Sequence, residues 1–250
     1  MAAMKAIVLA AGMSSRISSI TEGLPKTCLK INKNESILSR MLTLLKKQGF
    51  SEVKIIIGYA ADAMKNQIID LAHELPDLKI TYIENQEFLN KDNVYSVYLV
   101  REELGDHTFI LNSDIVFDEK ILAIATQEAK LSQDSFLMVD DHKNLVDEDM
   151  KVSFNQSTRI QRISKSLDND SAQGEYIGIM RIATKDKETY AAKLAELIEA
   201  GDVKRHYEYA LDQLVSKLRQ PMILKAVSTQ QLSWAEVDTK EDFLKLNEIV

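Results

Sequence analysis

Short apolar runs alternate with segments of helical periodicity through the first 140 residues of the chain. Residues 4–10 form a continuous apolar run ahead of Gly12, which predicts a buried strand. In residues 36–48 the apolar side chains repeat with the period of a helix, and Gly49 is typical of a helix end. The same pattern predicts further strands at residues 53–57, 78–83, 108–112 and 135–140, and helices at 61–75, 93–104 and 118–130.

The alternation of strands and helices with short connections predicts an α/β fold of three layers (α/β/α). Its sheet should be mainly parallel and Rossmann-like, because parallel strands need helical crossovers that cover both faces. After residue 140 the pattern changes, and three strands without long helices between them predict a small antiparallel insertion. The predicted elements of this part are strands at 149–155, 159–164, 174–182 and 222–228, and helices at 185–200, 205–218 and from Thr239.

Composition and charge exclude several classes of protein. The 250 residues are 45% hydrophobic and 28% charged, which is globular rather than disordered. No run approaches the ~18 apolar residues of a membrane span, and the N-terminus does not predict a secretory signal. The net charge of −7 argues against a nucleic-acid partner, and a single cysteine, Cys28, predicts neither a disulfide nor a cysteine-based zinc site. A cytoplasmic location is expected.

The segment after the first predicted strand is the strongest candidate for chemistry. It reads LAAGMSSR over residues 9–16, and Pro25-Lys26 follows. Small residues at a strand end let backbone N–H groups approach phosphate oxygens, and Arg16 and Lys26 add two cations. The P-loop pattern and the G-x-G-x-x-G pattern are both absent. Taken alone, the segment is equally consistent with a solvated turn.

These residues, with later blocks, resemble the nucleotidylyltransferases that join a nucleoside triphosphate to a phosphorylated small molecule. The usual second glycine of the turn is Ser14 here. The combination is most similar to the cytidylyltransferase branch that includes phosphocholine, 2-aminoethylphosphonate and inositol-phosphate enzymes. The matching blocks are DNVYSVYL at 92–99, NSD at 112–114, ISK at 163–165, GEYIG at 174–178 and WAEVDTKED at 234–242.

The resemblance implies Mg²⁺-dependent transfer of CMP from CTP, with Asp114 and Asp238 as the metal ligands. Both aspartates follow extended segments, and Mg²⁺ favours such hard oxygen ligands. Arg16 would hold the leaving pyrophosphate, and Lys26 would stabilise the α-phosphoryl group. The other predicted nucleotide-binding residues are Leu9, Ala10, Ala11, Gly12, Met13, Ser14, Ser15, Asn85, Asn93 and Ser113.

The acceptor is less well defined by the sequence. Lys165 matches a family lysine that faces the acceptor phosphate, and Asp140, Glu175 and Tyr176 are further candidates. Phosphocholine, an aminoalkyl phosphonate and a polyol phosphate all remain open. The chain is expected to form one domain over residues 1–250, with a nucleotide-binding half at 1–140 and an acceptor-binding half at 141–250.

Three of the polar residues have structural interpretations. Asn93 either reads the pyrimidine or caps the helix that it opens, since asparagine is common at helix N-caps. His206 and Glu208, in a predicted helix, are expected to be structural.

Other functions remain as alternatives. A sugar-1-phosphate enzyme that uses UTP or dTTP would share the chemistry. A catalytically silent relative would be expected to lack one of the four charged residues, and all four are present. A Rossmann-type oxidoreductase would require a glycine-rich fingerprint that this turn does not have.

Overall fold

The computed structural model describes residues 3–105, 107–217 and 221–246, and its contacts divide the chain into two compact units. Unit 1 comprises residues 1–89, 110–123 and 232–250, and unit 2 comprises residues 90–109 and 124–231. The predicted boundary at residue 140 is therefore not where the compact units divide. The difference arises because the chain returns to unit 1 for its last segment, which sequence order alone does not reveal.

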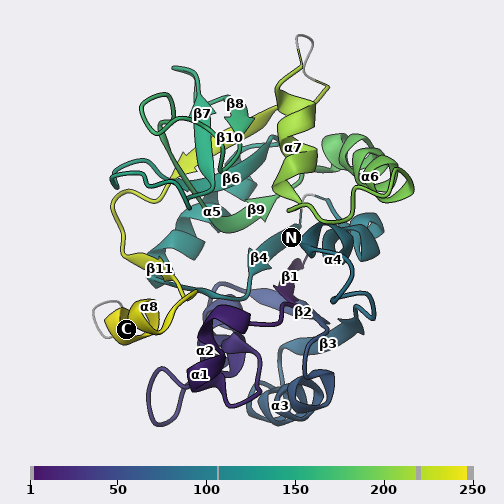
Figure 1. Cartoon of the computed structure of the whole chain (residues 1–250), viewed down its shortest axis with the longest axis vertical. Helices are drawn as coiled ribbons and strands as arrows, with labels where there is room; N and C mark the ends of the chain where they lie inside the picture. Colours follow the sequence, from purple (N-terminus) through teal and green to yellow (C-terminus); the bar gives the residue numbers. More distant parts are fainter. Residues whose placement is uncertain (1–2, 106, 218–220, 247–250) are drawn as a thin grey trace. The chain divides into compact units, whose positions relative to one another are not determined.

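Unit 1 is built on parallel strands, as the sequence pattern predicts. Strand β1 (Met4–Ala10) pairs with β2 (Phe50–Ile57), and β2 pairs with β3 (Lys79–Glu84), all in parallel. On the other side of β1 the next strand is β4 (Thr108–Asn112), whose last three residues belong to unit 1. The crossovers are helices α2 (Ile37–Lys47) and α3 (Ala61–Glu74) (Figure 1).

Local signals fix the ends of α2. Ser36 is the N-cap, and its hydroxyl accepts a hydrogen bond from the Ser39 N–H at 3.1 Å while Ser39 Oγ accepts one from the Ser36 N–H at 2.7 Å. This reciprocal pair satisfies two of the backbone donors that a helix start leaves unpaired. At the other end Gly49 has a φ of 84°, the left-handed conformation that favours glycine after a helix.

A second, two-stranded sheet in unit 1 joins distant parts of the sequence. Strand β5 (Ile115–Phe117) pairs antiparallel with β11 (Trp234–Glu236), and α8 (Lys240–Lys245) follows β11 (Figure 1). Short helical segments lie after β1: η1 (Ser15–Ile17), α1 (Ser18–Thr21) and η2 (Lys26–Cys28). A small core holds these pieces together, made of Ile17, Ile37, Val116, Val237 and Leu246.

Unit 2 contains the antiparallel strands. Strand β6 (Ser135–Asp140) lies between β9 (Gly174–Arg181), which is antiparallel to it, and β10 (Leu224–Ser228), which is parallel. The hairpin of β7 (Lys151–Phe154) and β8 (Ile160–Ile163) adds to β9 through β7. The insertion predicted after residue 140 is thus confirmed.

Helices complete unit 2. Helix α6 (Thr184–Glu199) lies beside α7 (Glu208–Val215) in Figure 1, and α6 also contacts α4 (Asn93–Leu99). A 3₁₀ turn, η3 (Arg101–Glu103), follows α4, and α5 (Glu119–Leu131) begins in unit 1 and continues into unit 2.

Two predicted helices are shorter in the structure. The helix predicted at 93–104 ends at Leu99, and the helix predicted at 205–218 covers Glu208–Val215; residue 218 lies outside the described residues. Helix α7 starts only at Glu208, and the Tyr207 N–H just before it donates to the side chain of Asn93. Within the described part of the chain, no helix has the length and apolar character needed to cross a membrane.

Candidate active site

The turn after β1 carries a small-residue segment whose backbone is held from two sides. The Ala11 carbonyl accepts a hydrogen bond from the Tyr59 N–H at 3.2 Å. Gly58 lies so close to Ala11 and Phe88 that a Cβ at residue 58 would meet Phe88 Cβ at 2.8 Å and the Ala11 oxygen at 2.9 Å. Around Gly12, in contrast, an added Cβ would meet no described atom within 4 Å, which leaves its backbone open to a ligand.

Ser14 connects this turn to Lys26. Its φ of 55° and ψ of 32° lie in the left-handed region, which explains why the family pattern favours glycine at this position. The serine hydroxyl accepts a hydrogen bond from the Lys26 backbone N–H at 2.9 Å, a contact that glycine cannot make. The backbone of Lys26 is therefore fixed to the turn.

Two cations and two aspartates meet in unit 1. The Lys26 ammonium lies 2.6 Å from Asp114 Oδ2 and 2.6 Å from Asp238 Oδ1. The Arg16 guanidinium contacts the other oxygen of Asp238 at 2.8 Å. The four residues that the sequence predicts as catalytic thus form one connected cluster, although they come from four separate parts of the chain.

Lys26 is charged in this cluster. Burial by itself lowers the pKa of the Lys26 ammonium, but the charges of Asp114 and Asp238 and their hydrogen bonds to it raise the pKa well above its ordinary value. The lysine therefore stays protonated at any physiological pH. Its side chain is only 16% exposed, whereas that of Arg16 is 62% exposed, so solvent screens Arg16 far more strongly.

A third carboxylate belongs to the same place. Asp114, Glu236 and Asp238 each offer an oxygen, and these oxygens lie within 4.8 Å of one another. Oδ1 of Asp114 is buried and accepts no hydrogen bond from any described residue. A buried carboxylate oxygen without a donor is costly, and a cation would satisfy it. The oxygen-only donor set fits Mg²⁺.

The last segment of the chain is held in place by β11 and the start of α8. Strand pairing sets Glu236 opposite Ile115, and the Val237 N–H donates to the Asp114 carbonyl at 2.8 Å. A capping box starts α8, in which Thr239 Oγ1 accepts from the Asp242 N–H and Asp242 Oδ2 accepts from the Thr239 N–H. These contacts fix the backbone on both sides of Asp238.

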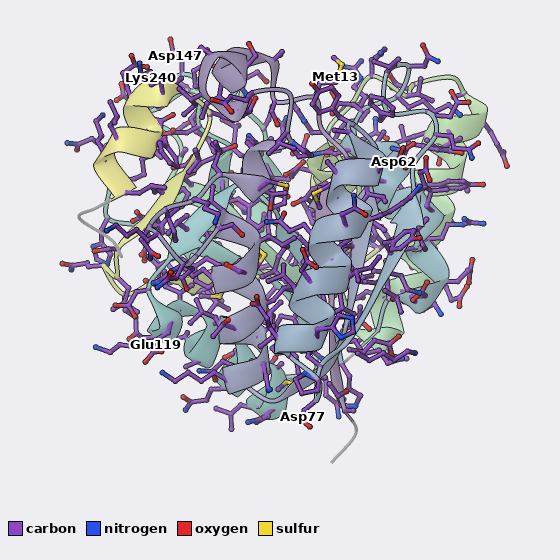
Figure 2. All side chains as sticks on the ribbon, turned by 90° about the horizontal axis from the view of Figure 1, so that it is seen from below. Met13, Asp62, Asp77, Glu119, Asp147 and Lys240 are labelled. Atoms are coloured by element: carbon purple, nitrogen blue, oxygen red, sulfur yellow. The ribbon has the colours of Figure 1, made fainter. Side chains whose placement is uncertain are left out.

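The cluster lies at one end of unit 1. Met13, which is close to Arg16 in sequence, and Lys240, which is close to Asp238, are at the top of Figure 2. Asp62, in the first turn of α3, is also at this end, whereas Asp77 lies at the opposite end. Helix α3 starts where β2 stops, so the top is the end at which the parallel strands finish. Ligands of open α/β sheets bind at this end.

The remaining predicted nucleotide residues of unit 1 follow its strands. Leu9 and Ala10 are buried at the end of β1, and Ser113 is buried between β4 and β5. Asn85 is also buried directly after β3, and its Oδ1 accepts a hydrogen bond from the Glu87 N–H at 2.9 Å. Their contact with a nucleotide stays a prediction.

Asn93 lies in unit 2 and has a structural contact. Its Oδ1 accepts a hydrogen bond from the Tyr207 N–H at 2.9 Å. The N-cap of α4 is Asp92, whose carboxylate accepts from the Asn93 N–H, so the interpretation of Asn93 itself as the cap is wrong. Asparagine here connects α4 to the start of α7, and its reading of a base stays a prediction.

The four predicted acceptor residues all lie in unit 2. Glu175 is buried on β9 and pairs with Lys143, and burial raises the pKa of its carboxyl to about 7. The buried Tyr176 hydroxyl is 2.8 Å from the Tyr207 hydroxyl. Asp140 Oδ1 accepts from the backbone N–H groups of residues 142 and 143, while Lys165 is exposed. No acceptor role follows from these contacts alone.

Glu208 stands out among the other polar groups of unit 2. It is buried in the first turn of α7, its Oε2 has no described hydrogen-bond partner, and burial raises the pKa of its carboxyl to about 7. Its neighbour Tyr207 is also fully buried. His206, by contrast, is half exposed and lies 3.9 Å from Asp92.

The sequence assigned no role to Glu236, although a signal for it was present. Glu236 and Asp238 are two residues apart in an extended segment, which places their side chains on the same side of the backbone. With Asp238 as a predicted ligand, this alternation marks Glu236 as a neighbour of the same ion.

The α/β fold thus carries a cluster of two cations and three carboxylates in unit 1. The chain belongs to the nucleotidyl transferase family, whose model matches residues 5–247.

Similar proteins fall within the same class. The chain is 32% identical over 111 residues to the choline-phosphate cytidylyltransferase of Streptococcus pneumoniae, a match that covers 44% of each protein. It is 28% identical over 116 residues to the 2-aminoethylphosphonate cytidylyltransferase of Lancefieldella rimae, covering 46% of this chain and 44% of that one. These matches thus span less than half the length of the relatives.

Solved structures show the fold over the whole chain. The structure of the CTP:phosphocholine cytidylyltransferase from Streptococcus pneumoniae matches with a TM-score of 0.78 and 21% identity, covering 99% of both chains. The inositol-1-phosphate CTP transferase of T. maritima matches with a TM-score of 0.75 and 20% identity, covering 100% of this chain and 97% of that one. The predicted three-layer α/β fold with a mixed, mainly parallel sheet is confirmed.

Proposed function

We propose that the protein transfers CMP from CTP to a small acceptor that carries a phosphate or phosphonate, and releases pyrophosphate. The observation that carries the proposal is the cluster in which Lys26 and Arg16 contact Asp114 and Asp238. Cytidylyl transfer is favoured over other nucleotidyl transfer because the relatives named above are cytidylyltransferases, one for choline phosphate and one for 2-aminoethylphosphonate.

The two cations would neutralise phosphate charge, which is the main requirement of this reaction. An acceptor oxygen attacks the α-phosphorus in line, so two anions must approach each other. Lys26 would bind the α-phosphoryl group and neutralise the charge that grows there. Arg16, more exposed and with a planar fork of donors, would bind the β- and γ-phosphates of the leaving group.

A magnesium ion would be held by Asp114 and Asp238, with Glu236 as a third neighbouring carboxylate. The unpartnered buried oxygen of Asp114 supports this assignment. When bound, Mg²⁺ would neutralise phosphate charge and withdraw electrons from the α-phosphorus. The protein's own part is to fix the carboxylates, through the β5–β11 pairing and the cap of α8.

The remaining contacts are assigned by unit. Residues 9–15, Asn85 and Ser113, which all belong to unit 1, would bind the nucleotide. The four acceptor candidates, which are Asp140, Lys165, Glu175 and Tyr176, all belong to unit 2. Lys165 would bind the acceptor phosphate or phosphonate, and the acidic side chains would suit an acceptor that carries an ammonium group.

Pyrophosphate release with Mg²⁺ tests the proposal. CTP, UTP, dTTP, ATP and GTP are crossed with phosphocholine, 2-aminoethylphosphonate, glycerol phosphate, inositol phosphate and glucose 1-phosphate. We expect turnover with CTP and one of the phosphate or phosphonate acceptors. Turnover only with a sugar 1-phosphate and UTP, dTTP or GTP would keep the reaction and refute the cytidylyl assignment.

A pair of variants connects the turnover to the cluster. Asp114→Asn keeps the size of the side chain but loses its charge, and should lower kcat/KM on the order of a hundredfold. Asp77→Asn is the matched control, because Asp77 is exposed, lies at the other end of unit 1 and pairs, among the described residues, with Lys46 at 3.4 Å. Equal activity of the two variants would remove Asp114 from the active site.

A further inference from the structure

The Lys26 ammonium contacts both of the aspartates that would hold a divalent ion. It lies 2.6 Å from an oxygen of Asp114 and 2.6 Å from one of Asp238. We propose that Lys26 and a divalent cation exclude each other at this pair of carboxylates, so that metal binding displaces the ammonium and frees it for the nucleotide. The inference rests on the proposed function only in assigning the ion to these carboxylates.

Simultaneous occupancy is opposed by distance and charge. Magnesium binds carboxylate oxygens directly at about 2.0–2.1 Å. An ammonium group that stays within hydrogen-bond reach of the same two carboxylates would then lie only about 3–5 Å from the ion, and a divalent ion and an ammonium group at such range in a partly buried site repel strongly. Since the Lys26 side chain is only 16% exposed, water screens this repulsion little.

The structure lets the side chain move without moving the backbone. The Lys26 N–H donates to Ser14 Oγ at 2.9 Å, and its carbonyl accepts from the Leu29 N–H at 3.0 Å. The next residues of η2, Thr27 and Cys28, are buried. Only the four-carbon stem of Lys26 is left to rotate, and a lysine stem is flexible enough for such a swing.

Arg16 cannot play the same part. Its ion pair among the described residues is with Asp238, at 2.8 Å, and its side chain is 62% exposed. Solvent therefore screens the effect of Arg16 on a nearby ion. The competition is thus specific to Lys26, which alone of the two bridges both aspartates.

If the metal displaces the Lys26 ammonium, metal binding and nucleotide binding should strengthen each other. Without a nucleotide, the displaced ammonium loses two carboxylate partners and gains only water. With a triphosphate present, the ammonium finds phosphate oxygens instead. By linkage, each of the two ligands should then raise the affinity for the other by the same factor.

The test is Mn²⁺ binding to the full chain without nucleotide. Binding is measured by the electron paramagnetic resonance signal of the free ion. Removing the competitor with Lys26→Met should tighten Mn²⁺ binding by about tenfold or more, since two charge-assisted hydrogen bonds no longer have to break. Asp114→Asn should weaken it. Lys65→Met is the matched control, because Lys65 also bridges two carboxylates, Asp62 and Glu84, neither of which belongs to the cluster, and this variant should leave Mn²⁺ binding unchanged.

A second measurement uses the wild-type protein and needs no variant to fold. Acetylation of Lys26, followed by mass spectrometry, should increase when Mg²⁺ is added, while acetylation of Lys65 should not. Equal or weaker Mn²⁺ binding by Lys26→Met would overturn the proposal, as would the same gain in Lys65→Met, or acetylation of Lys26 that Mg²⁺ leaves unchanged. Turnover with CTP is measured separately, so a failure of exchange and a failure of the proposed reaction are distinguishable.

Discussion

Ser14 combines a strained backbone with a hydrogen bond to Lys26, and two substitutions separate these effects. Ser14→Ala removes the bond from the hydroxyl to the Lys26 N–H and keeps the left-handed φ of 55°. Such a hydrogen bond contributes about 1 kcal/mol to the free energy of unfolding, and its donor is left without this partner. We therefore expect Ser14→Ala to lower that free energy by about 1 kcal/mol.

Ser14→Gly loses the same bond but relieves the strain. A left-handed residue with a Cβ costs roughly 1–2 kcal/mol, and the greater entropy of glycine in the unfolded chain returns about 0.5–1 kcal/mol of that. The gain and the lost bond nearly cancel, so Ser14→Gly should unfold within about 0.5 kcal/mol of the wild type.

Urea unfolding followed by circular dichroism compares the three proteins. The expected order of midpoints is wild type, then Ser14→Gly close to it, then Ser14→Ala. If the alanine variant is as stable as the wild type, the hydroxyl contributes nothing. If the glycine variant is less stable than the alanine variant, the backbone at residue 14 is not strained.

Two further predictions concern packing and pH. Gly58→Ala should lower the free energy of unfolding by about 1–3 kcal/mol and weaken nucleotide binding, because the new Cβ would press on Phe88 and on the Ala11 carbonyl; unchanged thermal unfolding would contradict the close approach. Burial raises the pKa of Glu208 from 4.5 to about 7, so the folded state binds this proton more tightly than the unfolded chain does, and Glu208 costs stability as the pH rises through this window. Between pH 4 and pH 8 the free energy of unfolding of Glu208→Gln should therefore rise by about 3 kcal/mol relative to that of the wild type. Urea unfolding of both proteins at each pH measures this difference. A difference that does not change with pH would refute the buried, protonated carboxyl.

The larger elements were predictable because long apolar patterns report them directly. Strand β1, helix α2 with Gly49 after it and the cap of α8 all follow from local signals. Strands β5 and β11 have three residues each, too short for any periodicity to register. Their pairing is a long-range contact, so the sequence could not predict it.

The candidate site shows the same limit at the level of side chains. Residue type and order pointed to Arg16, Lys26, Asp114 and Asp238, and the structure brings these four together. That one ammonium bridges both aspartates depends on distances that no spacing encodes. The position of Glu236 beside them was within reach of the two-residue alternation of a strand.

The pairing of β5 with β11 can form only late in synthesis of the chain. The two strands are about 120 residues apart in sequence, and a ribosome adds roughly 5–20 residues per second. Asp114 therefore leaves the ribosome about 6–24 seconds before Asp238, and during that interval the apolar β5 residues lack the strand that pairs with them. A nascent chain in this state offers an open strand edge to chaperones or to other chains, while the proposed metal ligands are still incomplete. The full-length chain must form the same long-range pairing after dilution from urea, so recovery of Mn²⁺ binding should lag behind the recovery of helix.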